Sequence, residues 1–141
     1  MRATNLLTRR QPPWQVLVSL AGVDAAGPWV HDVDRLVAPE QIRVSAADDE
    51  RQAVARIEAG GVDLAVLCSQ GATRGGLRTL EVVRARFTDL PCLVVAHETT
   101  AGILRRALEL RAESVIPQPV NVPLLAQLMV RILKKRFAVQ P

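Results

Sequence analysis

The sequence has few aromatic residues and no long apolar run, and each shortage excludes a class of protein. Aromatic residues make up 3% of the 141 residues, and Tyr is absent. Proteins that bind single-stranded nucleic acids stack bases on aromatic side chains, so we do not expect that activity. No apolar run approaches the ~18 residues that span a bilayer. The N-terminal residues have no apolar segment after Arg9 and Arg10, which excludes a signal peptide. We therefore expect a soluble, cytoplasmic protein without a membrane partner.

Cysteine is also scarce. Cys68 and Cys92 stand in apolar runs, and neither belongs to a CxxC pair or lies at metal-ligand spacing from a His. This pattern argues against a disulfide framework and against a zinc site. Two reduced thiols agree with a cytosolic protein.

The length and charge favour one globular domain. A chain of 141 residues and 15.4 kDa is long enough for one core but short for two. Hydrophobic residues make up 49% and charged residues 23%, a mixture typical of folded domains. The net charge is +4, yet basic residues cluster only at Lys134, Lys135 and Arg136. This is a weak electrostatic signature for DNA binding.

Short apolar strands alternate with amphipathic helices along the chain. The expected strands are residues 14–20, 42–44, 62–67, 92–96 and 114–116. The expected helices between and after them begin at Pro28, at Asp48 or Asp49, after the glycine-rich residues 71–76, at Thr99 or Thr100, and at Pro123. Near-continuous apolar strands with helical crossovers predict a parallel sheet covered on both faces. We therefore expect a three-layer, doubly wound α/β domain.

The same pattern divides the chain into three parts. Residues 14–137 form the expected domain, residues 1–13 a flexible N-terminal arm and residues 138–141 a C-terminal tail.

Three segments resemble the receiver domain of response regulators. They are DLAVLCSQGATRGGL at residues 63–77, DLPCLVVAHE at 89–98 and ALELRAESVIPQPV at 107–120, and the resemblance extends over about residues 15–135. It implies a CheY-like, flavodoxin-like fold with strand order 2-1-3-4-5 and a role in two-component signal transduction. It also implies a cis peptide bond before Pro119, which only an X-Pro bond adopts at low cost.

The residues that perform receiver chemistry are replaced at every matching position. Receivers phosphorylate an Asp with the help of a Mg²⁺ ion, two further acids, a Lys and a hydroxyl group. The matching positions here are the acidic pair at Ser19 and Leu20, the phosphoacceptor at Cys68, the hydroxyl at Ala96 and the Lys at Gln118. Val115 replaces the aromatic switch residue. The resemblance therefore predicts a pseudo-receiver that is no enzyme and binds no metal or cofactor. Asp24 lies nearby in the sequence, but a single carboxylate is a poor ligand set for Mg²⁺.

Two alternatives follow from individual residues. Cys68 at the phosphoacceptor position suggests a redox or ligand-responsive sensor, with His97 as a candidate activating group. An inert buried thiol is the other interpretation, because a reactive thiolate needs a nearby cation or helix N-terminus. The basic helix end at Lys134, Lys135 and Arg136 suggests a DNA-associated regulator, although such ends also complement the helix dipole. We do not expect nucleic acid to be the partner.

The last expected helix suggests a protein partner. Its core face is predicted at Leu125, Met129, Ile132 and Leu133, whereas Leu124 and Leu128 lie where receivers usually have polar residues. An exposed apolar surface usually marks an interaction site. The predicted contact residues, for homodimerisation or for docking a signalling protein, are Arg105, Arg106, Val115, Leu124, Leu128 and Arg131. The alternative is that the chain's own termini cover this surface.

Arg111 replaces the Gly that ends the preceding helix in receivers. If the backbone there remains left-handed, Arg costs about 1 kcal/mol relative to Gly. The alternative expectation is a rebuilt loop.

Overall fold

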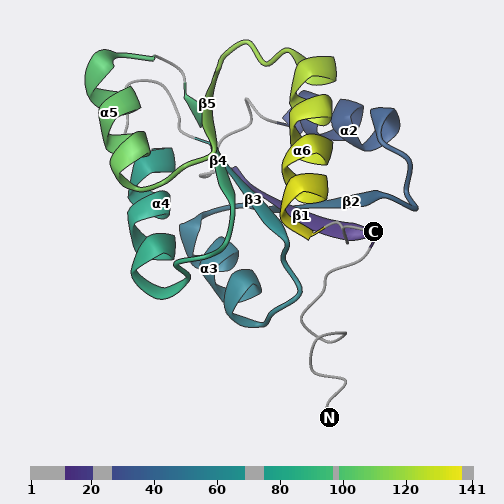
Figure 1. The fold of residues 1–141 in the computed structure, drawn as a ribbon, viewed down its shortest axis with the longest axis horizontal. Helices are drawn as coiled ribbons and strands as arrows, with labels where there is room; N and C mark the ends of the chain where they lie inside the picture. The colour runs from purple at the N-terminus through teal and green to yellow at the C-terminus, as the bar shows by residue number, and fades with distance from the viewer. Residues whose placement is uncertain (1–11, 21–26, 69–74, 97–98, 138–141) are drawn as a thin grey trace.

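The computed structural model describes residues 12–20, 27–68, 75–96 and 99–137. Five strands and five helices alternate in these described ranges (Figure 1). The strands are β1 (Trp14–Ser19), β2 (Ile42–Ala47), β3 (Leu64–Cys68), β4 (Cys92–Ala96) and β5 (Ser114–Pro117). The helices are α2 (Gly27–Leu36), α3 (Glu50–Glu58), α4 (Gly75–Arg86), α5 (Ala101–Glu109) and α6 (Val122–Phe137).

The strands form one parallel sheet in the order β2-β1-β3-β4-β5, which confirms the expected strand order. Ser19 pairs with Leu67, and Cys68 pairs with Val95. The carboxyl ends of β1, β3 and β4 therefore follow one another in steps of one residue along the strand direction. Crossover helices between parallel strands place these ends along one edge, where α/β domains build their sites.

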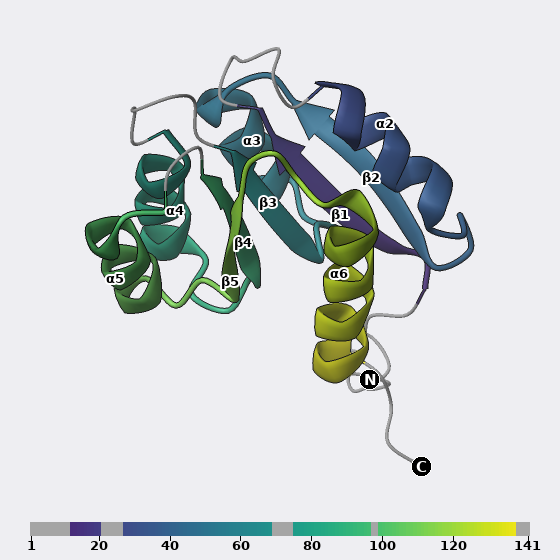
Figure 2. The same ribbon diagram turned by 90° about the horizontal axis from the view of Figure 1, so that it is seen from above.

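Two apolar cores hold the three layers together. One core lies between the sheet and helices α2 and α6, and the other lies between the sheet and α3, α4 and α5 (Figure 2). Every residue of β3 and β4 is buried, as expected for central strands that are covered on both faces. The observed architecture is the predicted doubly wound α/β domain.

Local capping signals set several helix boundaries. The Asp49 carboxylate accepts a hydrogen bond from the Gln52 N–H at 2.9 Å and caps α3. The Thr100 hydroxyl accepts from the Ile103 N–H and caps α5. Gly60 and Gly61 follow α3 with positive φ angles, the conformation that glycine adopts without strain.

Four of the five strands have boundaries that differ from the sequence prediction, and β1 ends at Ser19 instead of Leu20. β2 continues to Ala47 instead of ending at Val44, because its last residues pair in register with β1. β3 begins at Leu64 instead of Val62 and includes Cys68, while β5 extends to Pro117. Ser45, Ala46 and Ala47 have little strand preference of their own, so pairing with β1 decides where β2 ends.

A buried arginine, Arg84, joins the C-terminal ends of α4 and α5. Arg84 on α4 donates hydrogen bonds to the carbonyl oxygens of Phe87 and Leu90, beyond its own helix, and of Leu110 and Arg111, beyond α5. The bond from Arg84 Nε to Leu110 is 2.7 Å. Helix C-termini present unpaired carbonyl groups with partial negative charge, which favours a cation at this position. Arg84 thereby fixes the position of α5 relative to α4.

Arg111 has a left-handed backbone with a φ angle of 60°. The expectation of a rebuilt loop is therefore wrong, and the backbone keeps the conformation for which glycine is preferred. The Gln118–Pro119 peptide bond is cis, as the resemblance implied. No helix in the described part of the chain is long and apolar enough to cross a membrane.

Candidate functional site

The structure brings the predicted degenerate positions to one edge of the sheet. Ser19, Cys68 and Ala96 are the last residues of β1, β3 and β4, and all three are buried. Gln118 follows β5, and its backbone N–H donates to the Ala96 carbonyl oxygen at 3.2 Å. Leu20 follows β1, and its N–H donates to the Ala47 carbonyl oxygen.

The Cys68 thiol is enclosed and weakly acidic. Its side chain packs in the core under α2 and α6, and burial raises its pKa to about 12. A thiol with that pKa is protonated at neutral pH, and it is the thiolate that acts as nucleophile. His97, the proposed activating group, lies outside the described residues. The geometry favours the inert interpretation of Cys68.

The described side chains at this edge do not fit a magnesium ion. Mg²⁺ prefers carboxylate, phosphate and water oxygens in octahedral geometry, whereas Ser19, Cys68 and Gln118 offer a hydroxyl, a protonated thiol and an amide. Among residues 12–20, 27–68, 75–96 and 99–137, no three His, Cys, Asp or Glu side chains form a group that could hold a metal. Asp24 lies outside those ranges.

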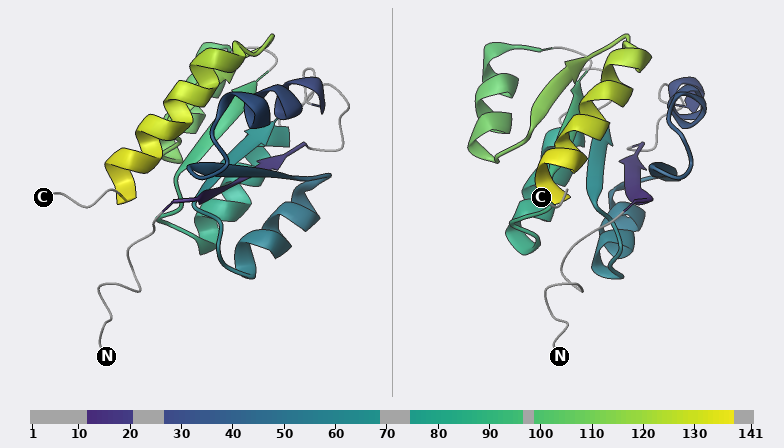
Figure 3. Two further views of the ribbon diagram at one scale, coloured as in Figure 1. Left: turned by 90° about the vertical axis from the view of Figure 1, so that its right-hand side faces the viewer. Right: turned by 45° about the vertical axis from the view of Figure 1, so that its right-hand side comes forward.

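Exposed apolar side chains gather on the side of the molecule where β5 forms the edge of the sheet. β5 is the last strand of the sheet and runs between α5 and α6 (Figure 3, right). Both helices carry exposed large apolar side chains. Leu108 is 75% exposed, Leu124 is 55% exposed and Leu104 is 46% exposed. Val115 and Leu128 are half-buried, and they line a common groove with Leu124. We call this surface the β5-edge face; it consists of Leu104, Leu108, Val115, Leu124 and Leu128.

Within the β5-edge face, a groove runs between β5 and α6. It has a volume of about 420 Å³, and Val115, Leu124, Leu128 and Arg131 are among its lining residues. These four predicted contact residues therefore lie together. Pro117 and Pro119 also line the groove, so much of its wall is apolar.

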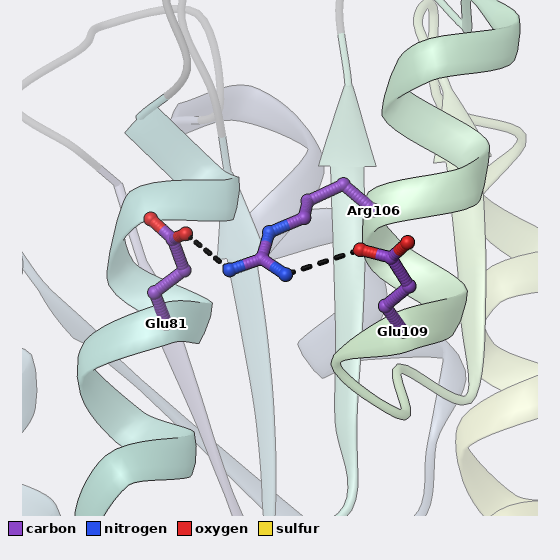
Figure 4. A network of polar contacts seen from close by, with 3 residues as sticks. All are labelled: Glu81, Arg106 and Glu109. Carbon is purple, nitrogen blue, oxygen red and sulfur yellow. Dashed lines mark hydrogen bonds and ion pairs between the residues drawn. The ribbon is translucent and has the colours of Figure 1, made fainter.

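Arg106 lies on the other side of α5. Its guanidinium pairs with Glu81 of α4 at 2.6 Å and with Glu109 at 3.1 Å (Figure 4), and these contacts hold its pKa above the ordinary value. The prediction that Arg106 borders the apolar surface is therefore wrong, because the side chain is directed toward α4. Arg105 is exposed and does not line the groove.

The orientation of α5 explains why Leu104 and Leu108 were not predicted from the sequence. Ala107 is buried and Arg106 faces α4. On a helix with 3.6 residues per turn, Leu104 and Leu108 then lie on the side away from α4. Their spacing of four residues was a signal for a shared face, but the sequence alone does not show that this face is exposed.

The same fold occurs in many solved receiver domains. The chain is similar to the Francisella response regulator 1452 receiver domain, with 19% identity, a TM-score of 0.71 and coverage of 89% of this chain and 98% of that one. It is similar to a CheY-like receiver domain protein from Methanospirillum hungatei, with 18% identity, a TM-score of 0.72 and coverage of 87% and 95%. It is also similar to the signal receiver domain of a putative Luxo repressor protein from Vibrio parahaemolyticus, with 16% identity, a TM-score of 0.73 and coverage of 89% of this chain and 92% of that one.

These likenesses establish the CheY-like fold of this chain. No protein-family model and no curated protein matches the sequence.

Proposed function

We propose that this chain is a pseudo-receiver: a receiver-fold module of two-component signalling that works by protein–protein interaction without phosphorylation or other catalysis. The observation that carries the proposal is the set of side chains at the carboxyl edge of the sheet. Ser19, Cys68 and Ala96 are buried and uncharged where receivers carry acids and a hydroxyl group. The fold supports a signalling role because the solved neighbours are receiver domains.

The β5-edge face is the proposed contact surface, either between two copies of the chain or with a signalling protein. Exposed leucines on both helices that flank β5 support this assignment. Burial of apolar surface contributes about 25 cal/mol per Å², so an exposed cluster of this kind favours association.

The first experiment tests phosphorylation. The full chain is incubated with a small phosphodonor and Mg²⁺, and intact mass is measured beside a catalytically complete receiver. We expect no mass increase of a phosphoryl group on this chain and a clear increase on the control. Incorporation of phosphate would refute the proposal.

The second experiment tests the contact surface by sedimentation equilibrium. The variant Leu108→Asp/Leu124→Asp changes two exposed residues of the β5-edge face, whereas the control Leu36→Asp changes a leucine on α2 with the same exposed fraction as Leu124. A dimer that dissociates only in the double variant supports self-association through this face. A monomer in all three proteins directs the proposal to a different protein partner, and a dimer that persists in the double variant contradicts a homodimer through this face.

A further inference from the structure

A second groove lies on the side of α6 that faces α2. It runs between α6 and the end of α2 with the residues that follow, and its volume is about 850 Å³. The two helices lie on the same face of the sheet (Figure 2). The apolar lining residues are Leu36, Val37, Ala38, Ala126 and Val130. Leu36 is 55% exposed, so the apolar surface is open to solvent.

Basic residues border this groove, which we call the α2/α6 groove. Arg131, Lys134 and Lys135 line it, together with Gln41 and Gln127, and none of the lining residues is acidic. The groove therefore combines an apolar surface with positive charge along α6.

These cations have no acidic partner among the described residues. The ion pairs of the described surface join Arg35, Arg78, Arg86 and Arg106 to nearby carboxylates, while Arg131, Lys134 and Lys135 form none. Three unpaired cations beside an apolar groove are complementary to a ligand that has apolar and anionic groups on adjacent faces.

We propose that the α2/α6 groove binds an acidic amphipathic helix of a partner protein. A helix that lies in a groove between two helices fills it with side chains at positions i, i+3, i+4 and i+7. Its flanking Glu or Asp residues would then face Lys134 and Lys135. A small molecule fits less well, because such ligands need enclosed pockets with a few convergent polar groups, and this groove is open with two glutamines as its uncharged polar lining.

Residues 1–11 and 138–141 have no acidic side chains that could pair with the cations of the α2/α6 groove. Residues 1–11 contain Arg2, Arg9 and Arg10 but no Asp or Glu, and residues 138–141 have no charged side chain. Charge complementarity therefore favours a separate partner over these segments.

This site is separate from the proposed function, since the groove and the β5-edge face lie on different sides of α6. Gln127 and Arg131 line both grooves, so the test leaves these two residues unchanged. Lys134, Lys135 and Leu36 line only the α2/α6 groove of the two.

The experiment measures binding of a synthetic helical peptide of about 18 residues to the full chain by fluorescence anisotropy. The peptide carries Leu at i, i+3, i+4 and i+7 with Glu on the flanking positions, and a matched peptide carries Lys in place of each Glu. We expect saturable binding of the Glu peptide and at least about tenfold weaker binding of the Lys peptide. Lys134→Glu/Lys135→Glu should weaken binding of the Glu peptide by about tenfold or more.

Two control variants make the result specific. Arg43→Glu/Arg51→Glu changes the net charge equally on exposed residues of β2 and α3 and should change affinity by less than about twofold. Leu36→Asp should abolish binding, whereas Leu124→Asp, with the same exposed fraction on the β5-edge face, should leave it unchanged.

Several results would overturn the proposal. They are no saturation by the Glu peptide up to about 1 mM, equal affinity for both peptides, or an unchanged affinity in Lys134→Glu/Lys135→Glu. A loss in Leu124→Asp but not in Leu36→Asp would assign binding to the β5-edge face instead. A dimer in sedimentation equilibrium that Leu36→Asp dissociates would assign the groove to a second copy of the chain.

Discussion

Arg84 Nη2 donates a hydrogen bond to the Arg111 carbonyl oxygen at 3.0 Å, so a buried side chain holds a residue whose own backbone is left-handed. Arg84 Nε also donates to the carbonyl oxygen of Leu110, the residue before Arg111, and Arg84 Nη1 donates to that of Leu90, which follows α4. The turn after α5 therefore keeps the conformation preferred by glycine although an arginine occupies it.

Arg111→Gly should stabilise the protein. Glycine adopts a positive φ angle without the steric penalty that a Cβ atom imposes, which predicts a gain of about 1 kcal/mol in the free energy of unfolding. Urea unfolding followed by circular dichroism measures the change. Arg111→Ala is the control, because it removes the same exposed side chain but retains the Cβ atom. Equal stability of the two variants would contradict the argument.

Replacing Arg84 should destabilise the protein strongly. Arg84→Met leaves four carbonyl groups without their donor, and we expect a loss of about 3 kcal/mol in the free energy of unfolding. Arg86→Met is the matched control on the same helix, since it removes only the exposed ion pair with Glu58 and should lose less than about 1 kcal/mol. A similar loss in both variants would show that the carbonyl contacts contribute little.

The Cys68 thiol should react slowly with a disulfide reagent. With a pKa of about 12 instead of 9.0, its thiolate fraction at pH 8 is roughly a thousandfold lower than that of a free thiol. The test uses Cys92→Ala, which leaves Cys68 as the thiol that reacts, and compares the native and urea-unfolded chains. Equal rates in the two states would contradict the inert interpretation and favour the redox alternative.

Stability should fall as the pH rises above 9. Burial raises the pKa of Cys68 to about 12 and that of Cys92 to about 11, from 9.0 in the unfolded chain. Above pH 9 the unfolded state loses these protons first, so the unfolding free energy decreases by up to about 1.4 kcal/mol per pH unit for each thiol. Cys68→Ala should show a shallower decrease than the wild type between pH 9 and 11. Parallel curves would show that Cys68 is not protonated in the folded state at these pH values.

The sequence predicted features that depend on local signals. The strand Cys92–Ala96 is bounded by Pro91 and is wholly apolar, and Asp49 and Thr100 are strong capping residues, so each was predictable from its neighbours. The core face predicted for the last helix is also confirmed, because Leu125, Met129 and Leu133 are buried. Their helical periodicity is again a local signal.

Features that depend on tertiary contacts were not predictable. The burial of Arg84 requires two helix ends to meet, which no local pattern shows. The direction of Arg106 depends on Glu81, which lies 25 residues earlier in the chain. The same contact determines that Leu104 and Leu108 belong to the β5-edge face. The contact residues predicted on α5 were Arg105 and Arg106, whereas the exposed apolar residues of this helix are Leu104 and Leu108.

The sheet ends at β5 with a strand that offers little to an incoming strand. β5 has four residues, ends in Pro117 and is followed two residues later by Pro119. Proline has no backbone N–H, so a hydrogen-bonded ladder along this short edge is interrupted at Pro117. The leucines of α5 and α6 are thus exposed beside a strand edge at which fibrous polymerisation by strand addition is disfavoured. Association on this side then depends on contacts between side chains.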